Sequence, residues 1–164
     1  MIVERLFTII GIVLFIPLYL PDTQKEILAV IRSKKTSYSR LLILRLVQIL
    51  AMVSISLAVF LLVLKLNRSE FNFLEIFFAE FATVIFLGGL LNISYAFFQN
   101  LIPSTMVAMM YYVLNMFSGS KYFGPFYLYT LMENDWQSKI WLFLAGVVLL
   151  TVSIILSTQQ KNNV

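Results

Sequence analysis

The stretch "LLILRLVQILAMVSISLAVFLLVL", residues 41–64, decides the fold class of this chain. The hydrocarbon core of a bilayer is about 30 Å thick, so a helix needs roughly 20 apolar residues to cross it. Within the quoted stretch only Arg45 and Gln48 interrupt the apolar run. The stretch therefore predicts a membrane-spanning helix.

The composition of the whole chain is also typical of a membrane protein. Of its 164 residues, 60% are hydrophobic and 12% are charged, whereas a soluble domain is about 25% charged. The chain has no Cys and no His, which excludes disulfides and Cys-ligated metals and removes the commonest general base. It also lacks a phosphate-binding loop. We therefore expect no enzyme activity, no catalytic residue, no cofactor and no metal site. The basic residues lie between spans, so we expect no nucleic-acid partner.

Four further apolar stretches predict spans. They are residues 6–20, 73–97, 104–118 and 139–157. With residues 41–64 they predict an all-α polytopic membrane helix bundle of about five transmembrane helices, in a single domain covering residues 1–164. Residues 6–20 also fit the apolar run of a signal peptide, although "PLYLPDT" offers no small-x-small cleavage site after it.

Basic residues in short loops set the orientation of a membrane protein. The largest cluster lies in residues 21–40 and comprises Lys25, Arg32, Lys34, Lys35 and Arg40. This cluster predicts that residues 21–40 are cytoplasmic. Five spans then place the N-terminus outside and the C-terminus in the cytoplasm, and we expect a multi-pass protein of the cell (inner or plasma) membrane.

Residues 21–40 also contain a predicted short helix. Thr23-Gln24-Lys25-Glu26 fits a capping box, and the apolar residues after it fall on one arc of a helix over residues 23–34. Two interpretations remain open at this point. The helix is either an interfacial one that lies on anionic headgroups, or one that docks a cytoplasmic partner protein.

The segment "TQKEILAVIRSKKTSYSRLLILRLVQIL", residues 23–50, resembles the cytoplasmic loop of ABC-2 type transporter permeases. In that family an amphipathic helix precedes a Ser-Lys-x-x-Ser-like turn, an Arg and a Leu-rich span. Here residues 33–37 and Arg40 occupy those places, without the family's usual Pro in the turn. Residues 88–120 resemble the fourth and fifth helices of the family, joined by a tight turn. Residues 121–135 resemble its short outer-leaflet helices before the last span.

The resemblance implies a membrane (permease) subunit of an ABC-type exporter, with a cytoplasmic ABC ATPase and a second permease subunit as partners. It makes residues 23–34 the coupling helix. The residues it places against the ATPase are Glu26, Ile27, Leu28, Val30, Ile31, Arg32 and Lys34. The family normally has six spans, so this chain looks as though it lacks the first. The implied substrate is amphipathic or peptide- or lipid-like.

Other classes of function compete with this interpretation. A small membrane scaffold or immunity protein would bind a partner in the bilayer and transport nothing. A pore former is the third class, against which the coupling-like loop argues. Co-purification with an ATPase separates the exporter subunit from both.

A few polar and small residues inside the predicted spans are the remaining site candidates. Glu80 is either part of a substrate path or a partly hydrated carboxylate near the outer interface, paired with a Lys or Arg at a span end. Gly88, Asn92 and Ala96 recur every four residues and suit close helix packing or a substrate-lining face. Asn115 is a candidate for a hydrogen bond between helices. The aromatics of "KYFGPFYLY", residues 121–129, fit a headgroup-level belt or a lateral gate.

Overall fold

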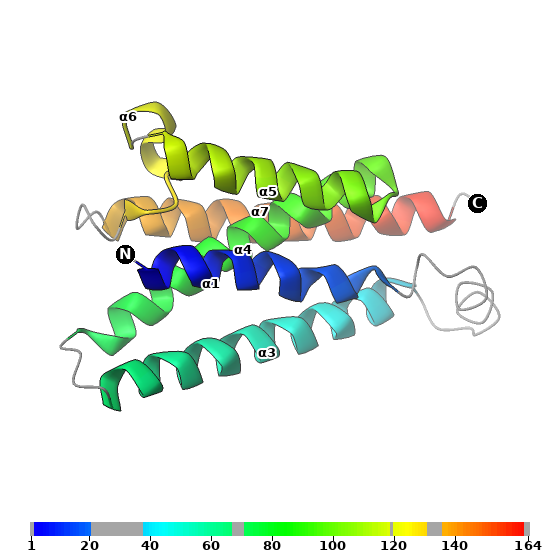
Figure 1. Ribbon diagram of the computed structural model, residues 1–164. Helices are drawn as coiled ribbons and strands as arrows, with labels where there is room; N and C mark the ends of the chain where they lie inside the picture. The colour runs from blue at the N-terminus through cyan, green and yellow to red at the C-terminus, as the bar shows by residue number, and fades with distance from the viewer. Residues whose placement is uncertain (1, 21–37, 67–70, 119, 131–135, 163–164) are drawn as a thin grey trace.

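The fold was analysed in a computed structural model that describes residues 2–20, 38–66, 71–118, 120–130 and 136–162 (Figure 1). All regular structure in these residues is helical, which confirms the all-α prediction. The elements in chain order are α1 (Ile2–Phe15), η1 (Ile16–Leu18), α3 (Tyr38–Leu66), α4 (Phe73–Phe98), α5 (Leu101–Phe117), α6 (Ser120–Phe123), η3 (Gly124–Phe126) and α7 (Trp136–Asn162).

Three of the helices are long and apolar enough to cross a membrane. These segments are Arg40–Leu66 of α3, Phe73–Phe98 of α4 and Trp136–Gln159 of α7. Two further apolar helical stretches are shorter, namely Phe7–Leu18, which runs from α1 through η1, and Leu101–Phe117, which is α5. At 1.5 Å per residue, α5 is about 25 Å long, less than the core of a bilayer. The membrane character of the chain is thus supported by three helices, and the number of five spans remains a prediction.

Two helix boundaries differ from those predicted, and a proline explains each difference. The first span was predicted over residues 6–20, whereas α1 ends at Phe15 and Pro17 lies in the first turn of η1. Proline has no N–H and its ring clashes with the carbonyl four residues earlier, so the α-helix stops before it. In α5 the helix starts at Leu101, ahead of Pro103, because the first turn needs no N–H bond.

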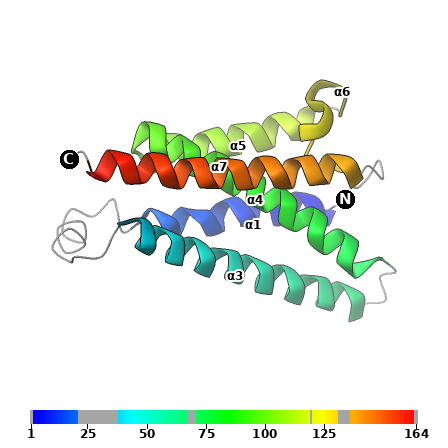
Figure 2. The same ribbon diagram turned by 180° about the vertical axis from the view of Figure 1, so that it is seen from behind.

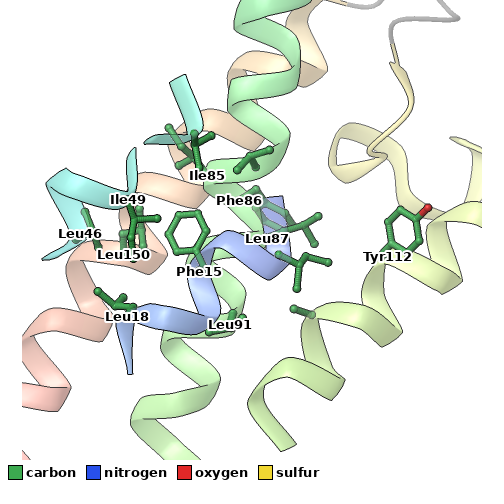
Figure 3. Packing of buried hydrophobic residues seen from close by; sticks show 14 of the residues in the cluster. Phe15, Leu18, Leu46, Ile49, Ile85, Phe86, Leu87, Leu91, Tyr112 and Leu150 are labelled. Atoms are coloured by element: carbon green, nitrogen blue, oxygen red, sulfur yellow. The ribbon is translucent and has the colours of Figure 1, made fainter. Parts of the chain in front are cut away.

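Helix α4 is the centre of the bundle. In an apolar window of 18 residues in α4, 67% of the residues are buried inside the protein, against 28% in the corresponding windows of α3 and α7. Both views show α1, α3, α5 and α7 arranged around α4 (Figures 1 and 2). Figure 3 shows residues from these helices meeting in one apolar cluster, with Phe15, Leu87 and Leu91 fully buried. A helix that is hydrophobic on all sides is expected in this position.

Glycines allow α1 and α7 to approach α4 closely. A Cβ on Gly89 of α4 would lie 2.9 Å from the carbonyl oxygen of Gly146 in α7, and one on Gly146 would lie 2.7 Å from the backbone nitrogen of Phe86. A Cβ on Gly88 would overlap the ring of Phe15 in α1. Small residues at such contacts let helices pack by their backbones, which is typical of membrane bundles.

The connections fall at two opposite ends of the bundle (Figures 1 and 2). We call the end with the N-terminus and α6 the amino end. The other is the carboxy end, where η1 ends, α3 begins and the C-terminus lies. At the carboxy end, Gln99 adopts a left-handed conformation (φ 50°) and Asn100 caps α5, its Oδ1 accepting a bond from the N–H of Ile102 at 3.1 Å. The turn between α4 and α5 is therefore as tight as the sequence predicts.

Candidate functional site: a buried polar layer at the amino end

A buried lysine holds three parts of the bundle together. Lys139 lies in the first turn of α7 and its side chain is 3% exposed. Its Nζ donates to Oγ1 of Thr83 in α4 at 3.0 Å and to the backbone carbonyl of Leu128 at 2.5 Å. An ammonium buried in a membrane protein is costly unless its hydrogens are bonded. Lys139 therefore ties α7 to α4 and to the segment that follows η3.

Glu80 places an acidic side chain within one turn of Thr83 on α4. It lies one turn before Thr83, and residues three apart share a face of a helix. Its side chain is 1% exposed. The sequence left two alternatives open, a substrate path and a partly hydrated carboxylate near the outer interface paired with a Lys or Arg at a span end. The burial of Glu80 argues against hydration, and its role stays a prediction. One acidic and one basic side chain, Glu80 and Lys139, are thus both buried at this end of the bundle.

Asn115 fixes the same segment from the other side. Its Oδ1 accepts a hydrogen bond from the backbone N–H of Leu128 at 3.1 Å, and its Nδ2 donates to the carbonyl of Tyr111 at 3.0 Å. Leu128 is therefore held at its N–H by α5 and at its carbonyl by Lys139. The predicted bond between helices takes another form, since Asn115 bonds to a connection rather than to a neighbouring helix.

The segment between α5 and α7 folds back into the protein. It begins with α6 and η3, in which Tyr122 is 82% exposed. It then turns inward, so that Leu128, Tyr129 and Thr130 are all buried. The aromatic run 121–129 thus divides into an exposed part and a part inserted in the bundle. We call Leu128, Glu80, Thr83, Asn115 and Lys139 together the polar layer.

The remaining predicted residues of the spans lie away from the polar layer. Gly88, Asn92 and Ala96 are buried on α4 between that layer and the carboxy end. Asn92 donates from Nδ2 to the carbonyl of Gly88 at 2.7 Å, within its own helix. Gly88 lies against the ring of Phe15. The structure therefore separates these three residues from Glu80 and Asn115, with which the sequence grouped them.

The predicted ATPase-contact residues cannot be placed. Glu26, Ile27, Leu28, Val30, Ile31, Arg32 and Lys34 all belong to residues 21–37, outside the described residues. The ends of this connection are placed, and both lie at the carboxy end, since η1 ends at Leu18 and α3 begins at Tyr38 (Figure 1).

Sequence reasoning missed Lys139, Thr83 and Leu128 as site residues. A signal for Lys139 was present, because it is the first residue of the span predicted at 139–157 and lies at the same end as Glu80. The described part of the chain holds no group of three His, Cys, Asp or Glu side chains that could bind a metal ion. The layer is built from hydrogen bonds that join α4, α5, α7 and the segment after η3. No family model, no curated protein and no solved structure matches the chain.

Proposed function

We propose that the chain is the membrane subunit of an ABC-type exporter. The observation that carries the proposal is the order of the connections in space. The end of η1, the start of α3, the tight turn at Gln99–Asn100 and the end of α7 share the carboxy end, while the short helices α6 and η3 lie at the amino end before α7. Such an arrangement agrees with what the resemblance of residues 23–50, 88–120 and 121–135 to the permeases implies.

The proposed mechanism is mechanical. A partner ATPase binds at the carboxy end through the predicted helix 23–34, and closure of an ATPase dimer moves that helix. Arg45 gives a route into the bundle, because its Nη1 lies 3.4 Å from the carbonyl of Leu18 and so connects α3 to the end of η1. Movement of α1 and α3 then reaches α4, against which both pack.

In this proposal the polar layer keeps the amino end closed. Lys139, Thr83 and Asn115 join α7, α4, α5 and the inserted segment, so the end opens only when several hydrogen bonds break together. The centre of the bundle is filled by α4. A substrate path therefore runs between this subunit and a second permease subunit, and an amphipathic or lipid-like substrate suits such a boundary with the bilayer.

The test is purification of the tagged full-length chain from its native membrane in mild detergent. The proposal predicts that an ABC ATPase, recognised by its phosphate-binding loop, co-purifies and that the chain stimulates its ATP hydrolysis. Co-purification with a bilayer protein and no ATPase would instead support the scaffold or immunity class.

A further inference from the structure

A hollow of about 490 Å³ lies on the flank of the bundle between α5 and α7. We call it the lateral hollow. One wall is aromatic and combines residues of α4, α5, α6 and η3, namely Phe86, Tyr111, Tyr122, Phe123 and Phe126. Its volume falls in the range of small-molecule sites, about 300–1,000 Å³. The hollow is thus large enough for an extended apolar group.

The aromatic wall is held in shape by its own contacts. The ring centroid of Phe86 lies 5.3 Å from that of Tyr111 and 6.1 Å from that of Phe126, in tilted arrangements. The Tyr111 hydroxyl donates to the carbonyl of Phe126 at 2.8 Å. The polar group of Tyr111 is thereby occupied by a hydrogen bond within the protein, while the residue lines the hollow. A preformed wall needs little ordering when a ligand binds.

The opposite wall belongs to a membrane-spanning helix. Ala145, Val148 and Leu149 of α7 line it, and Val148 is 58% exposed. Val148 is about 18 Å along α7 from Trp136, at 1.5 Å per residue. A leaflet's share of the hydrocarbon core is about 15 Å. This wall therefore lies at the depth of acyl chains and not in water.

A positive charge lies next in sequence to a residue of the hollow. Lys121 is exposed in α6, and the following residue, Tyr122, lines the hollow. A lysine near the membrane surface attracts an anionic headgroup by about 1 kcal/mol, or roughly fivefold in affinity. Tyr side chains prefer that same headgroup level. A positive charge beside an apolar hollow suits an amphipathic anion.

We propose that the lateral hollow binds one acyl chain of an anionic membrane phospholipid, with its headgroup at Lys121. The site holds whether or not the chain is an exporter subunit, since it rests only on α4–α7. The bound lipid would fill the space between α5 and α7 and so brace the inserted segment that also reaches the polar layer.

The test is a titration of the delipidated full-length protein with phosphatidylglycerol or phosphatidylcholine of identical acyl chains. Native mass spectrometry measures the binding of each lipid. Val148→Trp fills the hollow, and Val147→Trp is the matched control, because Val147 is also exposed (38%) but does not line it. Lys121→Glu tests the headgroup, with Lys65→Glu as the control at another exposed lysine of the amino end.

We expect a first phosphatidylglycerol that binds about fivefold more tightly than phosphatidylcholine. Val148→Trp should weaken the first binding event of both lipids by about tenfold through lost apolar burial, while Val147→Trp leaves it unchanged. Lys121→Glu should abolish the preference for phosphatidylglycerol without abolishing binding, and Lys65→Glu should keep it.

If the Val148→Trp and Val147→Trp variants bind the first lipid with equal affinity, the site is overturned. If the preference for phosphatidylglycerol survives Lys121→Glu, the headgroup assignment is overturned. A dimer that Val148→Trp dissociates, with lipid binding unchanged, would show that a second copy occupies the hollow instead. If Val148→Trp lowers the unfolding temperature, Ala145→Leu replaces it as the test variant, because this half-buried residue lines the same hollow. The same changes in lipid affinity are then expected of Ala145→Leu.

Discussion

The two ends of the bundle are built differently. At the amino end, Asn115 of α5 and Lys139 of α7 both bond to Leu128, and the buried Lys139 also bonds to Thr83 of α4. At the carboxy end, the turn between α4 and α5 depends on one left-handed residue, Gln99, and one cap, Asn100. The amino end therefore couples several elements through buried hydrogen bonds, whereas the α4–α5 turn at the carboxy end is held by its own backbone and one cap. This difference is the reason why the proposed function places closure at the first end and partner contact at the second.

The largest effect expected is a difference in accessibility between the ends. The native chain has no Cys, so single cysteines report cleanly. Tyr122→Cys, at an exposed position of the amino end, should react with an impermeant thiol reagent in intact cells. Ser37→Cys, in the connection at the other end, should react only after permeabilisation. Labelling of both from outside would contradict the predicted orientation and the docking of a cytoplasmic partner.

The next largest effect is expected on the free energy of unfolding when the buried Lys139 is replaced. Lys139→Met removes the hydrogen bonds to Thr83 and Leu128, and each buried polar group that loses its partner costs about 1–3 kcal/mol. Unfolding in detergent measures the loss, with Lys65→Met as the exposed control at the same end. Equal stability of the two variants would contradict the importance of the polar layer.

The partner substitution sharpens this test. Glu80→Gln alone should destabilise the protein, because it leaves the Lys139 ammonium with less compensating charge. The double variant Glu80→Gln with Lys139→Met should be more stable than the sum of the two single effects predicts, since neighbouring groups are not additive. If the losses of unfolding free energy in the two single variants add up to the loss in the double variant, the two charges do not interact.

A smaller effect is expected midway between the ends, where packing replaces hydrogen bonds. Gly146→Ala would press a methyl group against the backbone of Phe86 and should cost about 1–3 kcal/mol by overpacking. Gly88→Ala meets the ring of Phe15 instead, which can turn aside, so its cost should be lower. The unfolding midpoints of the two variants decide the order, and the reverse order would mean that the α4–α7 contact is the looser one.

The smallest effect is expected at the carboxy-end turn. Asn100→Ala removes the acceptor for the N–H of Ile102 and should cost about 1 kcal/mol, the usual value of a helix cap. Asn100→Asp keeps an acceptor and should be nearly neutral. If Asn100→Ala lowers the free energy of unfolding as much as Lys139→Met does, the distinction between the two ends is contradicted.

Much of the fold was predictable, because hydrophobic runs such as residues 41–64 allow few alternatives to a long helix. The ends of helices were predictable less well; η1 after Phe15 reflects the local geometry of Pro17. The polar layer was predictable only in its separate parts. Glu80 and Asn115 stood out as polar residues in apolar runs, but their burial depends on which helix is central and on the return of Leu128 into the bundle. Neither property is encoded by local spacing.

The central claim is that the carboxy end receives an ATPase through residues 23–34. Ala29→Glu combined with Glu26→Ala keeps the net charge but places a carboxylate on the predicted apolar arc. The measurement is the ratio of ATPase to this chain after co-purification, together with the stimulated rate of ATP hydrolysis. The proposal predicts that the swap releases the ATPase and abolishes stimulation while the chain stays folded in the membrane. An intact complex after the swap, with detachment of the loop from anionic vesicles when Lys34 and Lys35 are neutralised, would show a lipid anchor and contradict the claim.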